Sequence, residues 1–127
     1  MIKQLVKEIL TEEMTGKKQE AKVIASGKIS DRFIGKVCMF RTYSAGVHFG
    51  ELVEKDGQEC LVKDARRVYY WTHACSLSQL AMEGSKDLKN CKIAMMVNEI
   101  ILDQVIEIIP IPDDASKHLY GAAEWKK

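Results

Sequence analysis

The sequence predicts a single domain that is mainly β with short helices: a small, bent antiparallel barrel with an N-terminal helix and one inserted helix. Apolar and polar residues alternate in several strand-length segments between residues 36 and 110, as they do in half-buried strands. The Asp56-Gly57 pair between two of these segments is the signal of a tight hairpin. With 127 residues, the chain is long enough for one core and too short for two ordinary domains. Closure into a barrel would remove the exposed edges of an open sheet.

The chain begins with an amphipathic segment, residues 1–16, that we expect to be a helix. Its apolar residues recur at helical spacing, and Gly16 ends it in a position that tolerates a left-handed conformation. The apolar face would cover either the core of the same domain or a neighbouring subunit. Residues 17–35 are polar and are expected to connect this helix to the barrel domain, residues 36–112.

Strand patterns follow one another in the barrel domain, and a short helix interrupts them. We expect strands at residues 36–43, 47–55, 58–63, 66–71, 91–97 and 100–110. The inserted helix covers residues 76–84. Ser76 is its expected N-cap, Gln79 completes a capping box, and Gly84 ends the helix.

The C-terminal end of the chain is predicted to leave the sheet. Pro110 and Pro112 rule out a central strand beyond them. Residues 113–127 then form a tail that begins with a weak capped turn. Because an exposed tryptophan is uncommon, Trp125 indicates that this tail docks on another part of the protein.

The composition is that of an ordinary soluble globular protein, with 46% hydrophobic and 29% charged residues. A formal net charge of +1 argues against a protein that grips long duplex DNA through many phosphates, although it leaves room for a local basic site. No segment approaches the ~20 apolar residues of a membrane span. Lys7 and Glu8 interrupt the apolar stretch that a signal peptide would need. We therefore expect a cytoplasmic protein without a membrane partner.

The spacing of Gly50, Leu52 and Asp56 resembles the first motif of Sm-like proteins. As in that motif, an apolar return strand follows, and here it ends at Ala65. The resemblance implies a small bent-sheet barrel with an N-terminal helix, ring assembly through paired edge strands and, in many members, RNA binding. The asparagine that contacts RNA bases in that family has no counterpart after this hairpin, so the resemblance concerns the fold.

Longer strings carry a second resemblance. They are residues 41–47 (RTYSAGV), 65–71 (ARRVYYW), 74–84 (ACSLSQLAMEG) and 106–110 (IEIIP). These strings are similar to a family of small bacteriophage and prophage proteins of unknown function, and the similarity covers about residues 36–127. The resemblance implies a phage origin, and hence the cytoplasm of the host cell as the place of action. It implies no activity.

Arginine, aromatic and hydroxyl side chains form the candidate ligand site. Its residues are Arg41, Tyr43, Ser44, His48, Arg66, Arg67, Tyr70, Trp71, Ser76 and Ser78. An arginine fork binds phosphate oxygens, and Tyr70 and Trp71 offer flat faces on which a base can stack. Ser76 lies at an expected helix N-terminus, where free N–H groups favour an anion. Because neighbours on a strand face opposite sides, one of Arg66 and Arg67 could form a salt bridge while the other reaches the ligand.

Structural roles remain open for the same residues. The aromatic pair could belong to the core or to an interface, the two arginines could be solvated or ion-paired, and Ser76 could act only as a helix cap. Surface arginines contribute little to folding. Replacing Arg66 and Arg67 together by alanine is therefore expected to abolish ligand binding and to leave the fold intact.

The sequence predicts neither a metal site nor a cofactor. Its four cysteines are Cys38, Cys60, Cys75 and Cys91. They form no C-x-x-C pair and no histidine stands at ligand spacing, so we expect free thiols in a reducing compartment. A reactive Cys75, with His73 or His48 as its base, is the enzymatic alternative. No catalytic spacing supports it, and we expect a protein without enzymatic activity.

Together these observations favour a non-enzymatic, phage-encoded protein that forms homo-oligomers and binds a nucleotide or a short nucleic acid. One biological version is a counter-defence protein that sequesters a host immune nucleotide signal. Two alternatives stay open. One is an inhibitor that binds a host defence protein through an exposed apolar patch, and the other is a structural or assembly protein of the virion.

Overall fold

The computed structural model describes residues 28–126 of the chain. The chain divides into two compact units, Met1–Arg32 and Phe33–Lys127, and the sheet, the helices and the candidate site all belong to the second unit. Of the first unit, the structure describes residues 28–32, which include the start of the 3-10 helix η3 (Ile29–Phe33). The predicted helix at residues 1–16 and most of the predicted connector at 17–35 lie outside the described residues.

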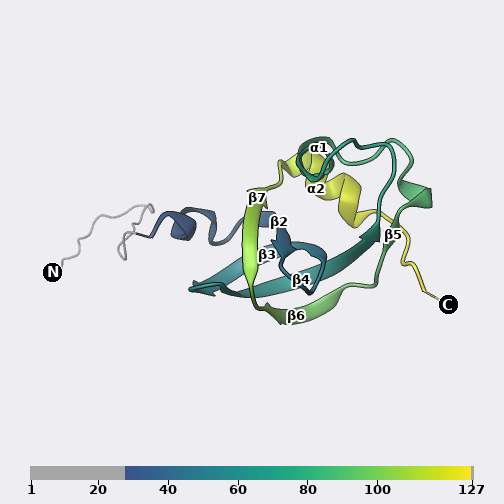
Figure 1. Cartoon of the computed structure of the whole chain (residues 1–127). Coiled ribbons are helices and arrows are strands. Elements are labelled where there is room, and N and C mark those ends of the chain that lie inside the picture. Colours follow the sequence, from purple (N-terminus) through teal and green to yellow (C-terminus); the bar gives the residue numbers. More distant parts are fainter. Residues whose placement is uncertain (1–27, 127) are drawn as a thin grey trace, which may run out of the picture. The chain divides into compact units, whose positions relative to one another are not determined.

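An antiparallel sheet of six strands forms the body of the second unit, which confirms the predicted mainly β fold with short helices (Figure 1). The strands are β2 (Val37–Thr42), β3 (Val47–Asp56), β4 (Glu59–Tyr70), β5 (Lys92–Ile93), β6 (Val97–Leu102) and β7 (Val105–Pro110). The order of the sheet is β5-β4-β3-β2-β7, and β6 also pairs with β4. Short turns join β2 to β3 and β3 to β4, whereas the other neighbours in the sheet are joined by longer segments of the chain.

The sheet is bent and open rather than a closed barrel. β4 pairs with β3 along one edge, and its other edge is shared by β6 and β5. β6 takes the first half of that edge, from Cys60 to Ala65, and β5 takes the end, from Val68 to Tyr70. Within residues 28–126 no ladder joins β6 to β7, so the predicted barrel closure is absent.

Gly50 allows β3 to pass unusually close to β4, beside a shift in their register. A Cβ atom at this position would lie 2.6 Å from Cγ1 of Val62 and 2.9 Å from the carbonyl oxygen of Lys63. Real Cβ contacts essentially never fall below 3.0 Å. Only glycine therefore fits where the two strands cross and bend.

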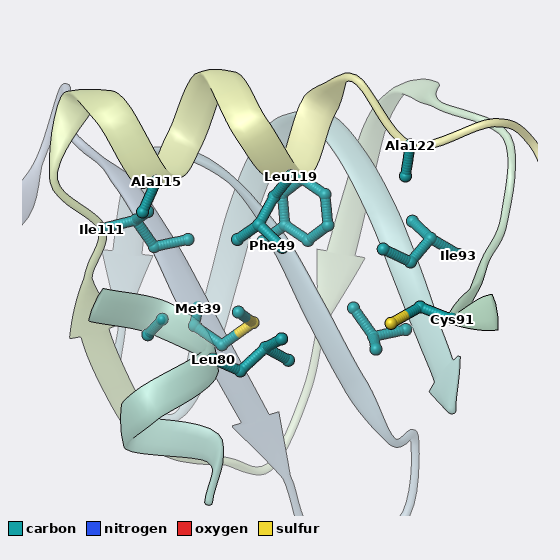
Figure 2. Packing of buried hydrophobic residues seen from close by; sticks show 11 residues of the cluster. Met39, Phe49, Leu80, Cys91, Ile93, Ile111, Ala115, Leu119 and Ala122 are labelled. Atoms are coloured by element: carbon teal, nitrogen blue, oxygen red, sulfur yellow. The ribbon is translucent and has the colours of Figure 1, made fainter. Parts of the chain in front are cut away.

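Both helices cover the same face of the sheet (Figure 1). They are α1 (Leu77–Glu83), inserted between β4 and β5, and α2 (Asp113–Tyr120), which follows β7. Figure 2 shows Leu119 of α2 and Leu80 of α1 directed toward Met39 and Phe49 of the sheet. This cluster is the larger of two cores. None of the helices in the described part of the chain is both long and apolar enough to cross a membrane.

A second core fills the opposite, inner face of the bent sheet. Its buried members are Cys38, Phe40, Leu52, Cys60, Val62, Ala65, Leu102 and Val105. Consecutive residues of β2, Met39 and Phe40, are both fully buried because they face different cores. The first four residues of this strand are therefore all apolar, which is the pattern of a strand covered on both sides.

Three elements differ from the sequence-based expectation. β4 is continuous across the gap predicted between residues 63 and 66, with Asp64 in a left-handed conformation at φ 54°. Residues 94–96 are not in a strand, so the predicted strand 91–97 is reduced to β5 and the first residue of β6. The predicted turn at the start of the tail is the eight-residue helix α2.

Candidate functional site

β3 and β4 bring His48 and Arg67 together, because these residues are partners in the ladder. Nε of Arg67 donates a hydrogen bond to Nε2 of His48 at 2.9 Å, and Nη1 donates to the Tyr69 hydroxyl at 3.4 Å. Arg67 is half-buried, whereas His48 is only 1% exposed. The arginine therefore connects a buried imidazole to the protein surface.

His48 is held in the neutral form. Burial, and then the positive charge of Arg67, lower the pKa of His48 to about 4. Because Nε2 accepts the hydrogen bond from Arg67, the single ring proton sits on Nδ1. Nδ1 is buried and has no hydrogen-bond partner among the described residues. An unpaired buried donor costs about 1–3 kcal/mol, so this atom requires an explanation.

An exposed aromatic–cation patch lies beside the His48–Arg67 pair. It consists of Arg67, Tyr69, Tyr70, Lys92 and Trp125. The first three residues belong to β4, Lys92 belongs to β5, and Trp125 comes from the C-terminal tail. Tyr69 is 55% exposed, Tyr70 50% and Trp125 39%, so all three rings present a face or an edge to solvent.

Contacts between rings and cations connect every member of the patch. Cζ of Arg67 lies 5.7 Å from the Tyr69 ring centroid, and the Tyr69 and Trp125 centroids are 5.1 Å apart. Nζ of Lys92 lies 5.5 Å from the Trp125 ring and 5.9 Å from that of Tyr70. Separations below about 6 Å are those of cation–π pairs. The five side chains thus form one continuous surface that combines flat rings with positive charge.

The tail that carries Trp125 is fastened to the sheet, which confirms the prediction that it docks. The Trp125 backbone N–H donates to the Ile93 carbonyl at 2.8 Å. Ala122 belongs to the core under α2, and Figure 2 places it beside Ile93. These anchors hold the indole over the end of β4.

Arg66 lies in the core rather than on the surface and is 3% exposed. Its guanidinium donates to four carbonyl oxygens, those of Ile93, Ala94, Tyr120 and Ala122, at 2.7–3.2 Å. These bonds tie β4 to the end of β5 and to the end of α2. The expectation that Arg66 is a surface arginine, dispensable for folding, is therefore wrong, and the alternation along β4 leaves Arg67 as the arginine near solvent.

Arg41, Tyr43 and Ser44 are located around the turn between β2 and β3 and the loop before β7. Nε of Arg41 pairs with the Glu107 carboxylate at 2.9 Å. Oγ of Ser44 donates to Oε1 of Gln104 at 3.1 Å, and Tyr43 is 77% exposed. No described contact joins these three side chains to the aromatic–cation patch. Their place in a ligand site stays a prediction.

The remaining predicted residues surround α1. Nε1 of Trp71 donates to the Ala74 carbonyl, and its ring packs against the larger core. Oγ of Ser76 accepts from the Gln79 N–H at 3.1 Å, which confirms the cap, and Ser78 is exposed. With only seven residues, α1 is too short to make its N-terminus an anion site on its own.

Sequence reasoning missed Tyr69, Lys92 and Trp125 as members of one surface. Tyr69 was visible in the aromatic run before the inserted helix, and Trp125 had been recognised as a docked residue. No pattern in the sequence marked Lys92 as a member of this surface. The pairing of β5 with β4, which brings Lys92 to Tyr70, could not be read from the spacing of the residues.

Cys38, Cys60 and Cys91 are buried and Cys75 is exposed, all as free thiols. Burial raises the pKa of Cys38 to about 12 and also raises that of Cys60. Among residues 28–126, no three His, Cys, Asp or Glu side chains are grouped as metal ligands would be.

The family of a domain of unknown function, DUF6948, matches residues 35–119. The chain belongs to this family. The DUF6948 region contains the whole sheet and nearly all of α2, so Arg67, Tyr69, Tyr70 and Lys92 lie inside it, while Trp125 lies beyond its end. No curated protein matches the sequence.

Among the solved structures that resemble the fold are two Sm proteins. A heptameric archaeal Sm protein is 16% identical with a TM-score of 0.41, and the similarity covers 65% of this chain and 94% of that one. The SmAP1 heptamer of P. aerophilum is also 16% identical, with a TM-score of 0.43 and coverage of 71% and 99%.

Proposed function

We propose that this protein binds a nucleotide or a short single-stranded nucleic acid on the aromatic–cation patch and catalyses no reaction there. The observation that carries the proposal is the continuous chain of ring and cation contacts through Arg67, Tyr69, Trp125, Lys92 and Tyr70. Proteins that bind single strands combine these two elements, because a base stacks on a ring while a phosphate is attracted to a nearby cation.

The two cationic side chains of the patch, Lys92 and Arg67, have donor groups that a phosphate could bind. Lys92 is exposed, and its described interactions are with the two rings. Among residues 28–126, Nη2 of Arg67 has no hydrogen-bond partner, since its bonds use Nε and Nη1. The patch therefore has two cationic donors beside stacking surfaces, which suits one or two nucleotides better than a long duplex.

The biological setting we propose is a phage protein that acts in the host cytoplasm. In that setting the patch would sequester a nucleotide signal of host immunity. The competing proposal is an inhibitor of a host defence protein. It is supported by two exposed methionines, Met95 at 54% and Met96 at 47%, of which Met95 lines the same pocket as Arg67 and Tyr69. A third role, in virion assembly, has no specific feature of the described residues in its favour.

Fluorescence anisotropy with labelled oligonucleotides tests the proposal. Replacing Tyr69 by alanine is expected to weaken binding about 5- to 150-fold, the range for loss of one stacked base. Lys92→Ala is expected to reduce the slope of log affinity against log salt by about 0.7, because one phosphate contact is lost. The matched control is Lys36→Ala, since Lys36 also lies over a ring, that of Phe33, but just before β2 and outside the patch.

The result separates the candidate ligands. Tight binding of cyclic or linear mononucleotides that resists added oligonucleotide would favour sequestration of a signal. Binding of oligonucleotides alone would favour a single-strand role. If Tyr69→Ala and Lys92→Ala bind as the wild type does, or if no nucleotide binds, the proposal is wrong and the protein inhibitor becomes the leading hypothesis.

A further inference from the structure

The chain leaves α2 as a short exposed tail that reaches the aromatic–cation patch. Ala122 still belongs to the larger core, whereas residues 123–126 are exposed and lie in no helix or strand. In the described part of the chain, the bond from the Trp125 N–H to the Ile93 carbonyl, at 2.8 Å, is the only backbone hydrogen bond of residues 123–126. A segment with so few internal bonds opens at a low cost in free energy.

Each ring of the aromatic–cation patch is already in contact with another of its members. Lys92 lies over the rings of Tyr70 and Trp125, and Arg67 lies over that of Tyr69. The centroids of Tyr69 and Trp125 are 5.1 Å apart, too close for two rings that lie side by side, so one ring covers a face of the other. A stacked base needs such a face. The contact between Tyr69 and Trp125 therefore removes a stacking position from the ligand.

Of the two neighbours of the Tyr69 ring, Trp125 is held more weakly than Arg67. Arg67 belongs to β4, which is paired on both edges, and its guanidinium donates to Nε2 of His48 at 2.9 Å. The Trp125 ring contacts Tyr69 and Lys92, and both of these side chains are exposed. Among residues 28–126, no hydrogen-bond acceptor holds the indole N–H. Trp125 is therefore the contact of Tyr69 that yields more easily to a ligand.

The end of the tail can move without disturbing the core beneath it. Nη1 of Arg66 donates to the Ala122 carbonyl at 2.8 Å, and Ala122 is only 9% exposed, so the tail is fixed at this residue. The next two residues, Ala123 and Glu124, are exposed and have no backbone hydrogen bond in the described part of the chain. Rotation within these two residues moves Trp125 away from the sheet while Ala122 stays in place.

We propose that Trp125 is a displaceable lid, which covers Tyr69 in the free protein and gives its place to a base of the ligand. The inference rests on the proposed function and adds a conformational step to it. Because the lid has to open first, the apparent affinity is lower than the intrinsic affinity by the fraction of open molecules. Tyr69 lies inside the DUF6948 region, whereas the lid lies beyond residue 119, where that region ends.

Removal of the lid from the full-length protein should tighten binding. Trp125→Ala is expected to lower the dissociation constant for labelled oligothymidylate or labelled ATP about 2- to 10-fold, the worth of one aromatic pair. In a Tyr69→Ala background the same change should have no effect, because the lid then has no ring to cover. Met82→Ala is the matched control, since Met82 of α1 is 42% exposed, close to the 39% of Trp125, and lies outside the patch.

Fluorine NMR follows the lid directly. The chain has two tryptophans, Trp71 and Trp125, so labelling with 5-fluorotryptophan gives two resonances, and the spectrum of Trp125→Phe assigns them. A saturating amount of either probe should move the Trp125 resonance toward that of a solvent-exposed indole. The resonance of Trp71, which packs against the larger core, should stay in place. If Trp125 instead becomes less exposed, it closes on the ligand, and the inference is wrong.

The outcomes distinguish the lid from the proposed function. If the wild type binds a probe and Trp125→Ala binds it equally or more weakly, Trp125 is not a lid, and the patch can still be a nucleotide site. If Trp125→Ala tightens binding in the Tyr69→Ala background as well, the inference is also wrong. If Trp125→Ala does not fold, the fluorine spectra decide alone. If neither the wild type nor Trp125→Ala binds either probe, both proposals fail.

Discussion

At the scale of single residues, two adjacent arginines lie in opposite environments. Arg66 is buried and donates to backbone carbonyls at the ends of β5 and α2, whereas Arg67 reaches the surface and binds His48. The alternation of a strand places consecutive side chains on opposite faces. One arginine therefore stabilises the fold, and its neighbour is available to a ligand.

Replacing Arg66 is expected to destabilise the protein strongly. The variant Arg66→Ala would remove four hydrogen bonds to carbonyl oxygens, of which only that of Ile93 keeps another donor, the Trp125 N–H. Hydrogen bonds to a charged group are worth about 1.5–3 kcal/mol each. We expect a loss of at least about 3 kcal/mol in the free energy of unfolding, measured by urea titration. Arg66→Lys should recover little, because an ammonium group cannot reach all four oxygens.

Arg67→Ala is the control for this prediction. Arg67 is half-buried and its loss leaves Nε2 of His48 without a donor, so it should cost about 1–3 kcal/mol, less than the loss of Arg66. Similar unfolding midpoints for the two alanine variants would contradict the structural role of Arg66.

His48 should make the stability of the protein depend on pH. Burial lowers its pKa from 6.5 to about 4 in the folded state, so between these values the unfolded chain binds more protons than the folded chain. Stability is therefore complete above pH 6.5 and falls as the pH drops toward 4, by roughly 3 kcal/mol at most. Urea titrations at neutral pH and near pH 4 measure the loss.

The variant His48→Phe isolates this contribution. A phenyl ring does not titrate, so the variant should lose less stability over the same pH interval than the wild type does. Parallel pH profiles for the two proteins would show that His48 is not buried in the neutral form.

At the scale of secondary-structure elements, β4 organises the domain. It is the longest strand, with 12 residues, and it pairs with β3, β5 and β6. Its C-terminal half carries both arginines and two of the three rings of the patch. The close crossing of β3 over β4 at Gly50 makes this arrangement possible.

Gly50→Ala should therefore weaken the whole sheet. The new Cβ would have to displace Val62 and the backbone at Lys63 and Ala65, which belong to the centre of β4. Overpacking of this kind costs typically about 1–3 kcal/mol. The matched control is Gly121→Ala at the C-cap of α2, where the nearest atom lies at 3.3 Å and φ is −74°. An equal shift in melting temperature for both variants would contradict the account of the bend.

At the scale of the whole molecule, the open sheet leaves the outer edges of β5, β6 and β7 without a partner strand in the described part of the chain. β6 pairs with β4 alone, and β7 pairs with β2 alone. Exposed strand edges are templates for pairing with another chain. Ile101 on β6 is 67% exposed and Ile106 on β7 is 46% exposed, so these strands also present apolar side chains.

We therefore expect the protein to self-associate, with β6 of one copy beside β7 of the next. Light scattering should give a mass above the 14.4 kDa of one chain at micromolar concentration. Ile101→Lys should shift the equilibrium toward the monomer, because a charge on an edge strand opposes pairing. A single species of 14.4 kDa across the concentration range would rule out self-association. The docked tail is not an argument for an oligomer, because Trp125 packs on Tyr69 of its own chain.

Local patterns in the sequence were enough to predict several features of the fold. Alternation predicted the strands between residues 36 and 110, Asp56-Gly57 predicted the hairpin, and Ser76 with Gln79 predicted the start of α1. The sequence also showed the aromatic residues that lie at the end of β4, and it predicted that the tail docks on the protein. These signals are local because turn chemistry, capping and strand periodicity each act over a few residues.

Which of these residues come into contact depends on the tertiary structure. Whether Arg66 or Arg67 is the buried arginine depends on which face of β4 the helices cover. The helices come from distant parts of the chain. Lys92 and Trp125 reached Tyr69 and Tyr70 through β5 and the tail, across long sequence separations. The predicted closure of the barrel was also wrong for this reason. β6 and β5 share one edge of β4, and no ladder joins β6 to β7 within residues 28–126. Pairing between distant strands is set by packing of the whole core, which no local pattern in the sequence records.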